Sequence, residues 1–337
     1  MVVLGIETSC DETSAAVVAD GVVKSNVISS QLVHRKYGGV VPELASRAHQ
    51  RLIIQVVEEA LARGAAQKED LSGIAATYGP GLAGALLVGL NFGKALAYAL
   101  HIPFAGINHI EGHLYSNFLG EEKPSYPFLS LIVSGGHTML VHVESEFQHR
   151  VLGQTRDDAA GEAFDKVSKM LGLGYPGGPA IDGQGSQGDP RAIRFPRSFL
   201  EEDSYDFSFS GVKTAVLYYL REKKLDPKAG ALDPARLADI CASFQASVVD
   251  VLVAKTMRAT RELNVRDVCI AGGVSANSEL RRRLGDEARV GGFRLFHPTL
   301  EYCMDNGAMI AYVGWLRLRR GIGSGMDLAA VPNLELA

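Results

Sequence analysis

Two histidines four residues apart are the pair in this chain best placed to do chemistry together. His109 and His113 stand in the stretch His-Ile-Glu-Gly-His. On a helix they would share one face, where both rings could bind one metal ion through neutral imidazole nitrogens. The stretch differs from the zinc-protease motif His-Glu-x-x-His, because Glu111 would lie about 200° around the helix from His109. A bare pair is more often two unrelated histidines, so a metal site requires a third ligand and a substrate site.

Acidic residues beside turns are the candidates for the third ligand: Asp11, Glu12 and Asp305. Asp305 is expected at the N-cap of the last helix, where capping alone would account for it. A second acidic group crowds another helix start, and most of it is interpreted as a solvated face favoured by the helix dipole: Asp157, Asp158, Glu162 and Asp165.

Three turns could approach phosphate oxygens. Ser134-Gly135-Gly136 offers backbone amides without side chains in the way, although a hairpin needs glycine in any case. An earlier turn supplies the hydroxyls of Thr8, Ser9 and Thr13. The stretch 271–277, with Asn277 at its end, follows a strand and opens a helix, where amide groups attract anions. It matches neither the P-loop nor the dinucleotide-binding fingerprint.

Composition limits the classes of protein that fit. The chain has 337 residues, a formal net charge of -4 and 47% hydrophobic residues, which indicates a globular protein of two ordinary domains. Four scattered cysteines without a Cys-x-x-Cys pair, and an N-terminus without a basic region before an apolar core, favour a reducing cytoplasm and no signal peptide. The apolar stretch 82–100 contains Asn91 and Lys94 and is interpreted as a buried helix, with no membrane span.

No global positive field is available for nucleic acid, so RNA would need a local basic patch. Four short basic clusters could supply one, although ion pairs and solvated helix faces explain any single cluster more readily: 34–36, 191–197, 221–224 and 281–283.

The elements that position these residues follow from periodicity. Strands are predicted at 2–6, 13–18 and 22–28, a helix at 42–63, a strand at 74–77, a helix at 82–100, and a strand at 104–107 before the histidine helix. The first half is therefore βββαβαβα.

The second half repeats this order with insertions. Strands are predicted at 128–133, 137–143 and 148–152, then a helix at 158–171, a Gly/Pro-rich loop at 172–178, helices at 212–223 and after Pro234, a strand at 267–271, a helix to 289, a strand at 293–297 and a last helix at 306–320. Two such halves imply two similar α/β lobes with a ligand in the cleft between them.

Eight motifs in order resemble the bacterial TsaD family, formerly called Gcp or O-sialoglycoprotein endopeptidase, over nearly the whole chain: 5–13, 38–47, 109–113, 133–138, 161–166, 175–179, 207–211 and 271–277. One departure lies next to Asp305, where Met304 stands in place of the family's usual threonine. The resemblance implies an actin-like (ASKHA) fold of two duplicated ribonuclease-H-like lobes. The lobes would span 1–124, with the helix 306–320 packing back on it, and 125–305.

The resemblance implies transfer of a threonylcarbamoyl group from threonylcarbamoyl-AMP to the exocyclic amine of the adenosine 3′ of the anticodon, in tRNAs that read ANN codons. Because the donor is an activated mixed anhydride, the absence of a Ser-His-Asp signature is no objection. Two alternatives stay open: a metallopeptidase, as the older family name suggests, and an actin-like nucleotide-binding scaffold with a structural metal.

The resemblance also assigns residues. One divalent metal, Fe²⁺ with Zn²⁺ as the alternative, would be held by His109, His113 and Asp305. ATP or threonylcarbamoyl-AMP would contact a further set: Ile132, Val133, Ser134, Gly135, Gly136, Asp165, Gly178, Asp182 and Asn277. Asp11 and Glu12 are our hypothesis for the residues that orient or deprotonate the incoming amine. The implied partners are tRNA, a TsaB-like paralogue that forms a heterodimer with this chain, a TsaE-like P-loop ATPase and a threonylcarbamoyl-AMP synthase, with no membrane.

Overall fold

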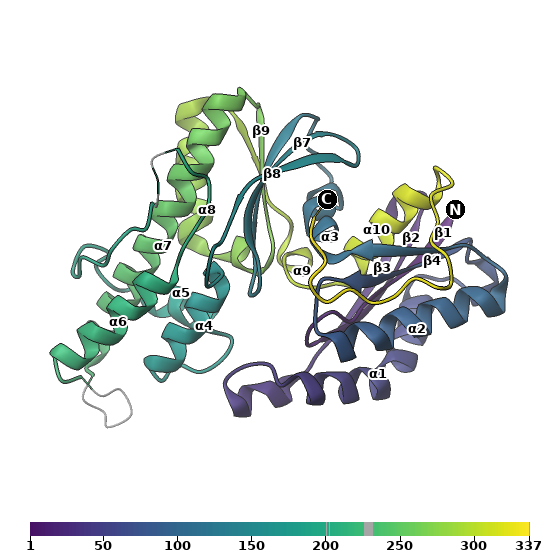
Figure 1. Cartoon of the computed structure of the whole chain (residues 1–337), viewed down its shortest axis with the longest axis horizontal. Coiled ribbons are helices and arrows are strands. Elements are labelled where there is room, and N and C mark those ends of the chain that lie inside the picture. Colours follow the sequence, from purple (N-terminus) through teal and green to yellow (C-terminus); the bar gives the residue numbers. More distant parts are fainter. Residues whose placement is uncertain (200, 202, 226–231, 337) are drawn as a thin grey trace. The chain divides into compact units, whose positions relative to one another are not determined.

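The computed structural model describes residues 1–199, 201, 203–225 and 232–336, without the side chains of Leu32 and Arg35 (Figure 1). The chain divides into two compact units. The first comprises Met1–Lys123 and Pro298–Ala337, and the second comprises Pro124–His297. The second lobe was expected to extend to residue 305, but 298–305 belongs to the first unit. Glu301 accepts a hydrogen bond from Asn26 of that unit (3.2 Å), and Asp305 lies against His113.

A five-stranded sheet of order β3-β2-β1-β4-β5 forms the centre of the first unit. The first three strands pair antiparallel, and β4 and β5 add parallel to β1. The elements are β1 (Val2–Glu7), β2 (Glu12–Ala19), β3 (Val22–Ser30), α1 (Pro42–Arg63), β4 (Gly73–Gly79), α2 (Ala83–Leu100), β5 (Phe104–Asn108), α3 (His109–Tyr115), α9 (Leu300–Cys303), α10 (Gly307–Leu318) and the 3-10 turns Leu32–Tyr37, Lys68–Asp70 and Ser116–Phe118.

Both faces of this sheet are covered, which explains why its first strands are almost continuously apolar. Along β2, Ala15 and Val17 pack into a core with α1 residues, while Ala16 and Val18 pack with Ala308 and Ala311 of α10. In Figure 1, α1 and α2 accordingly lie on one side of the sheet and α10 on the other. The last helix is thereby fixed against the strands that begin the chain.

The second unit repeats the strand order, as β8-β7-β6-β9-β10, again with three antiparallel strands followed by two parallel ones. Its main core joins β6, through residues such as Leu131, to α4 through Phe164 and to α7 through Phe244. The elements are β6 (Phe128–Val133), β7 (Thr138–Ser145), β8 (Gln148–Gln154), α4 (Ala160–Met170), α5 (Gly177–Gly185), α6 (Ser210–Glu222), α7 (Pro234–Leu263), β9 (Asp267–Ala271), the 3-10 turn Gly273–Ala276, α8 (Ser278–Gly291) and β10 (Arg294–Phe296).

The predicted α/β class and the duplicated order of elements are confirmed. The prediction of a loop up to residue 178 is wrong, because α5 begins at Gly177. This helix is rich in glycine and lacks a long apolar stripe, so periodicity gave no signal for it. Its first amide, that of Gly177, is held by the Asp165 carboxylate at 2.6 Å, a tertiary contact.

Among the described residues, two helices are long and apolar enough to cross a membrane by composition alone, α2 with mean hydropathy 1.4 and α7 with 1.6. Within the most apolar window, 78% of α7 but only 33% of α2 is buried inside the protein. The interpretation of α2 as a buried helix is therefore correct for one face of the helix and wrong for the other. Gly89 and Gly93 let one face approach the sheet at Thr8 and Ala76, while the opposite face leaves Tyr98 72% exposed.

The close packing of α10 on β1 predicts a stability effect. A Cβ on Gly5 of β1 would lie 2.3 Å from the amide nitrogen of Ala311, so Gly5→Ala must push α10 away from the sheet. We expect the free energy of unfolding to fall by about 1–3 kcal/mol. Fluorescence of Trp315, the single tryptophan of the chain, reports the urea unfolding of this unit.

The control is Gly285→Ala in α8 of the second unit, where an added Cβ meets no atom within 4 Å. It should not lower the Trp315 transition. An unchanged transition in Gly5→Ala would show that the contact between β1 and α10 tolerates a methyl group.

Candidate metal centre

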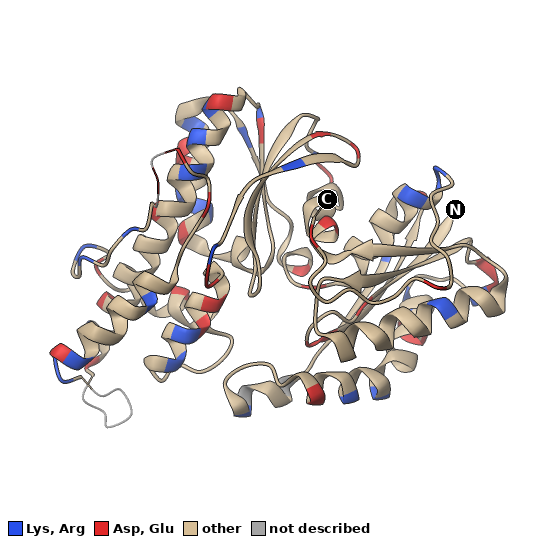
Figure 2. Cartoon of the chain, in the orientation of Figure 1, with Lys and Arg blue, Asp and Glu red and all other residues tan. Residues whose placement is uncertain are grey.

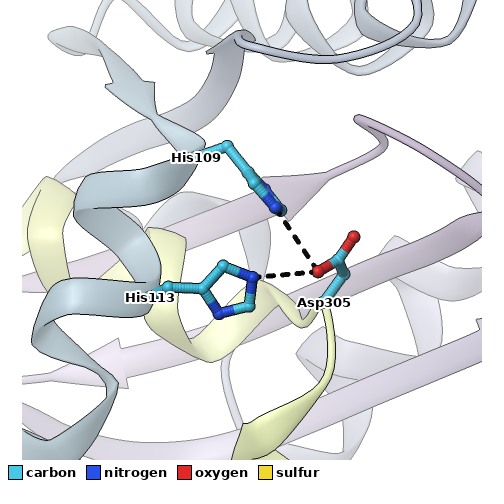
Figure 3. Close-up of side chains that lie close together, drawn as sticks. All are labelled: His109, His113 and Asp305. Atoms are coloured by element: carbon cyan, nitrogen blue, oxygen red, sulfur yellow. Dashed lines mark hydrogen bonds and ion pairs between the residues drawn. The ribbon is translucent and has the colours of Figure 1, made fainter. Parts of the chain in front are cut away.

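His109 and His113 lie in the first two turns of α3, directly after β5 (Figure 3). The helix starts here because the Asn108 side chain accepts hydrogen bonds from the amides of Ile110 (2.8 Å) and Glu111 (3.4 Å), a standard N-cap. Figure 3 shows both rings directed toward Asp305, which approaches from the segment before α10. Elements nearly two hundred residues apart in sequence thus bring the three predicted ligands together.

The geometry fits one metal ion. Asp305 Oδ1 lies 3.1 Å from His113 Nε2 and 3.4 Å from His109 Nε2, and one ligand atom from each residue lies within 4.8 Å of the others. Ligand atoms that bind one ion at 2.0–2.2 Å are about 3–3.5 Å apart. Two imidazoles and one carboxylate are a donor set suited to iron or zinc.

Glu7, for which no sequence motif indicated a role, orients the first histidine. Its Oε2 lies 3.0 Å from His109 Nδ1 and accepts a hydrogen bond from the Thr77 hydroxyl at 2.6 Å, while its Oε1 accepts one from the Ser9 amide. A proton on His109 Nδ1 leaves the lone pair of Nε2 directed at Asp305. Metal-binding histidines commonly donate their second nitrogen to a carboxylate in this way.

The charges of the cluster also favour a cation. Burial alone would lower the pKa of His109, but Asp305 and Glu7 outweigh burial and raise that pKa well above its ordinary value. Burial likewise opposes ionisation of Asp305, but the two histidines outweigh it and hold the pKa of Asp305 well below its usual range. A divalent ion would take the place of the proton that these carboxylates stabilise on His109.

Asp305 does not cap the last helix, contrary to the sequence expectation. The N-cap of α10 is Asn306, whose side chain accepts a hydrogen bond from the amide of Met309 at 3.0 Å. The carboxylate of Asp305 is therefore free of the capping role and faces the two histidines. Sequence spacing could not separate two adjacent candidates for one cap, because helix boundaries are uncertain by a residue or two.

Glu111 points away from the histidines, as the helical spacing predicted. It is 2% exposed and binds the guanidinium of Arg317 in α10 with both carboxylate oxygens, at 3.1 and 2.8 Å. A carboxylate engaged in this way cannot serve as the general base of a zinc peptidase. The ion pair instead joins α3 to α10, the two helices next to the ligands.

The two acids assigned to the amine lie where the turn after β1 meets β2: Asp11 ends the turn, and Glu12 is the first residue of β2. Asp11 is half-buried, whereas Glu12 is buried beside the metal centre. Burial, followed by the charges of Asp305 and Asp11, raises the pKa of Glu12 to about 9. Such a strongly shifted carboxyl group is typical of functional sites.

In the second unit, the Ser134-Gly135-Gly136 turn exposes both glycines, and an added Cβ at either would meet no atom within 4 Å. The Ser134 hydroxyl accepts a hydrogen bond from the His137 amide at 3.1 Å and so stabilises the turn itself. Ile132 and Val133 have completely buried side chains, so only their backbone could contact a ligand.

The loop after β9 packs against this turn. Gly272 has φ +85°, and a Cβ there would lie 2.4 Å from the carbonyl oxygen of Val133. A Cβ on Gly161 at the start of α4 would lie 2.5 Å from the Ser134 carbonyl oxygen. The turn at Ser134, the loop at Gly272 and the start of α4 at Gly161 are therefore in backbone contact within the second unit. The turn and the loop are two of the segments that were predicted to approach phosphate.

The remaining predicted contacts of the nucleotide-like substrate have partners inside the protein. Asn277 caps α8 by accepting from the Leu280 amide (3.0 Å) and donates to Gln245 (2.8 Å). Asp182 accepts from the amide (3.0 Å) and hydroxyl (2.7 Å) of Ser278, and Gly178 has open space beside its Cα. These side chains, together with Asp165 of α4, which accepts from the first amide of α5, fix helix starts in the second unit, and their contact with substrate stays a prediction.

The acidic group before α4 is not a simple solvated face. Asp157 accepts hydrogen bonds from the hydroxyls of Ser208 and Ser210, both at 2.6 Å, and from the Phe209 amide at 2.8 Å. Asp158 pairs with Lys213 at 2.7 Å. Both carboxylates therefore hold the start of α6, a role that only the folded chain reveals.

Basic residues are interspersed with acidic ones along the helices of both units (Figure 2). In the cluster 281–283, Arg282 pairs with Glu279 (2.7 Å) and Asp286 (3.0 Å), and Arg283 pairs with Asp250 (2.9 Å). Ion pairing thus accounts for these two arginines, as expected from the sequence.

The contact between Glu7 and His109 predicts metal affinity. Glu7→Gln keeps the side-chain size but removes the negative charge behind the imidazole, so we expect about 10–100-fold weaker metal binding. Competition with a chelator measures this affinity. The control, Glu43→Gln, alters an exposed carboxylate of α1 paired with Arg47 and should retain full affinity. Equal affinity in Glu7→Gln and the unmodified protein would contradict the role of Glu7.

Comparison with known proteins identifies the family of the chain. Residues 21–312 match the family model described as TsaD: tRNA N6-adenosine threonylcarbamoyltransferase. Relatives with that name are 58% identical in Salinibacter ruber, 52% identical in Geotalea uraniireducens and 48% identical in Thermotoga neapolitana. Each alignment covers at least 98% of this chain and at least 96% of the relative.

Solved structures with the same architecture are more distant in sequence. Full-length HypF in the phosphate- and nucleotide-bound form matches with a TM-score of 0.61 at 13% identity, over 96% of this chain and 47% of HypF. The activator of 2-hydroxyisocaproyl-CoA dehydratase from Clostridium difficile matches with a TM-score of 0.51 at 15% identity, over 95% and 97% of the two chains. These likenesses confirm the actin-like fold. The extent and identity of the sequence matches show that the chain belongs to the TsaD family of tRNA N6-adenosine threonylcarbamoyltransferases.

Proposed function

We propose that this transferase moves the threonylcarbamoyl group of threonylcarbamoyl-AMP to N6 of the adenosine 3′ of the anticodon in tRNAs that read ANN codons. Family membership supports the reaction. The observation that carries the mechanism is the convergence of His109, His113 and Asp305, with Glu7 behind the first ring.

The reaction depends on positioning of the two substrates more than on activation of the donor, because the donor is already a mixed anhydride. The adenosine amine forms a bond to the carbamoyl carbon, the bond from that carbon to the phosphate oxygen breaks, and AMP leaves. The amine loses one proton, which we assign to Asp11 or to Glu12 in its carboxylate form, a form that a divalent ion at the neighbouring ligands would favour. No covalent intermediate on the protein is required.

His109, His113 and Asp305 would hold one divalent metal, Fe²⁺ or alternatively Zn²⁺. When bound there, the metal supplies Lewis-acid chemistry and orients the threonyl part of the substrate. Glu7 keeps the His109 ring in the tautomer with Nε2 free. The ion pair between Glu111 and Arg317 holds the histidine helix α3 against α10.

The nucleotide part, in ATP or threonylcarbamoyl-AMP, would bind in the second unit. The open backbone amides of Gly135 and Gly136 can donate to phosphate oxygens and stabilise charge on the departing AMP. Asp165, Asp182 and Asn277 would contribute by fixing the helix starts around Gly178. Two proteins with this fold were solved with nucleotides, which agrees with this assignment.

The two alternatives make different demands. A metallopeptidase of the His-Glu-x-x-His type uses the glutamate of the histidine helix as its base, and Glu111 is bound to Arg317 instead. In a scaffold with a structural metal, removal of the metal would unfold the protein, and no reaction would be lost because the scaffold catalyses none. Chelator-sensitive cleavage of a protein substrate would favour the first, and metal-independent binding of ATP without transfer to tRNA would favour the second.

The proposal includes three protein partners and a cytoplasmic location, where tRNA is available. The partners are the TsaB-like paralogue, the TsaE-like ATPase and the synthase that supplies threonylcarbamoyl-AMP. Exposed apolar side chains on neighbouring helices support docking of the paralogue: Ile54 on α1 is 56% exposed, and Leu87 and Tyr98 on α2 are 47% and 72% exposed.

The decisive experiment supplies threonylcarbamoyl-AMP labelled in threonine to unmodified tRNA, with the purified chain and its partners. We expect label in the tRNA with the unmodified chain and none with the double variant His109→Ala, His113→Ala, because two of three ligands are gone. Metal content and circular dichroism should show an intact fold without bound metal.

A tRNA with guanosine in place of the adenosine 3′ of the anticodon is the acceptor control, and it should stay unlabelled. Full transfer by the double variant in the absence of metal would exclude the metal from the mechanism. No label with the unmodified chain, with partners proven active, would favour the scaffold.

The assignment of Asp11 and Glu12 predicts a separate kinetic effect. Asp11→Asn or Glu12→Gln removes the group that takes the amine proton, so we expect kcat to fall by about 10²–10⁴-fold in the variant that lacks it. Metal content and KM for tRNA should change little. Unchanged kcat in both variants would remove these residues from the role.

A further inference from the structure

The turn that carries Asp11 and Glu12 is held by its backbone carbonyls. The Ser9 carbonyl accepts from the Leu82 amide (2.8 Å), and the Asp11 carbonyl accepts from the Gln31 amide (3.3 Å). Between them, the Cys10 carbonyl accepts from His49 Nε2 at 2.9 Å. Of these three donors, only His49 uses a side chain.

His49 lies on α1, and its side chain is completely buried. Its second ring nitrogen, Nδ1, lies 2.8 Å from the hydroxyl of Thr13, the residue just after Glu12. The ring therefore spans the turn, with one nitrogen on the residue before Asp11 and the other on the residue after Glu12.

These contacts fix the proton of the ring. A carbonyl oxygen can only accept, so His49 Nε2 carries the proton and Nδ1 accepts from the Thr13 hydroxyl. Burial lowers the pKa of His49, despite the opposing effect of the Cys10 carbonyl, which agrees with a neutral ring. The side chain of Gln31 donates to the Ala45 carbonyl (3.3 Å) and packs beside the ring.

The other side of the same turn touches the metal centre. The Ser9 hydroxyl lies 3.2 Å from His109 Nδ1, and the Ser9 amide donates to Glu7. The short segment 9–13 thus contacts His109 through Ser9 and contacts His49 through Cys10 and Thr13. Asp11 and Glu12 lie within this segment. A shift of this segment would move the acids relative to the metal ligands.

We propose that His49 is a positioning residue for the transfer reaction: its hydrogen bonds to Cys10 and Thr13 hold Asp11 and Glu12 at a fixed position relative to the metal ligands. The inference rests on the proposed function and adds a residue that does not itself touch substrate. Misplacement of a reacting group by about 1 Å can reduce a rate by about 100-fold.

Two amide substitutions separate position from mere packing. The amide nitrogen of Gln reaches about as far as Nε2, whereas that of Asn reaches only as far as Nδ1. His49→Gln can therefore still donate to Cys10, and His49→Asn cannot. We expect kcat for transfer to stay within a few-fold in His49→Gln and to fall about 100-fold in His49→Asn and His49→Leu, with metal content and KM for tRNA unchanged.

The control for stability is Ser25→Ala. Ser25 also ties α1 to the sheet, because its buried hydroxyl donates to the Ala60 carbonyl (2.6 Å) and accepts from the Val17 amide (3.2 Å), near the far end of α1. This variant should lose thermal stability and keep kcat. If His49→Leu fails to fold, the comparison of His49→Gln with His49→Asn still tests whether the hydrogen bond to Cys10 is needed for transfer.

Three results would overturn the inference. They are equal kcat in His49→Asn and Ser25→Ala, an equal loss in His49→Gln and His49→Asn, or loss of metal from His49→Asn, which would place His49 in metal binding. Absence of transfer by the unmodified chain would instead reject the proposed function itself, so the two failures are distinguishable.

Discussion

Two carboxylates, the buried one of Glu7 and the half-buried one of Asp305, lie against one imidazole ring and constrain the first unit. Glu7 and Asp305 approach His109 from opposite sides, and the ring can satisfy both only with a proton on Nδ1 and positive charge, a second proton or a metal ion, at Nε2. Uncompensated charges are expensive to bury, so the strands and helices around them must hold these atoms closely. The metal centre is thus a structural constraint as well as a chemical one.

The packing of α10 makes that constraint possible. Asp305 comes from a segment far along the chain, and it reaches the histidines because Gly5 and Gly307 let α10 lie directly on β1 and β2. The ion pair between Glu111 and Arg317 then joins α10 to the histidine helix from the other side. Close backbone contact and a buried ion pair together set the distance between the ligands.

The second unit uses the same topology for a different purpose. Its hairpin turn at Ser134 presents open amides, and the helix starts around it are fixed by Asp157, Asp165 and Asp182. Acidic residues here mostly hold amides and hydroxyls of their own chain. One duplicated fold thereby carries a candidate metal-ligand group in one copy and open glycine-containing turns in the other.

The sequence determined the α/β class, the duplicated order of strands and helices, the helical spacing of His109 and His113 and the outward direction of Glu111, because each follows from local periodicity. Its motifs also pointed to the family. Tertiary structure alone decided that α5 is a helix, that Asn306 and not Asp305 caps α10, and that Glu7 contacts His109 while His49 contacts Cys10 and Thr13. These features depend on contacts between residues distant in sequence, and no local pattern encodes such contacts.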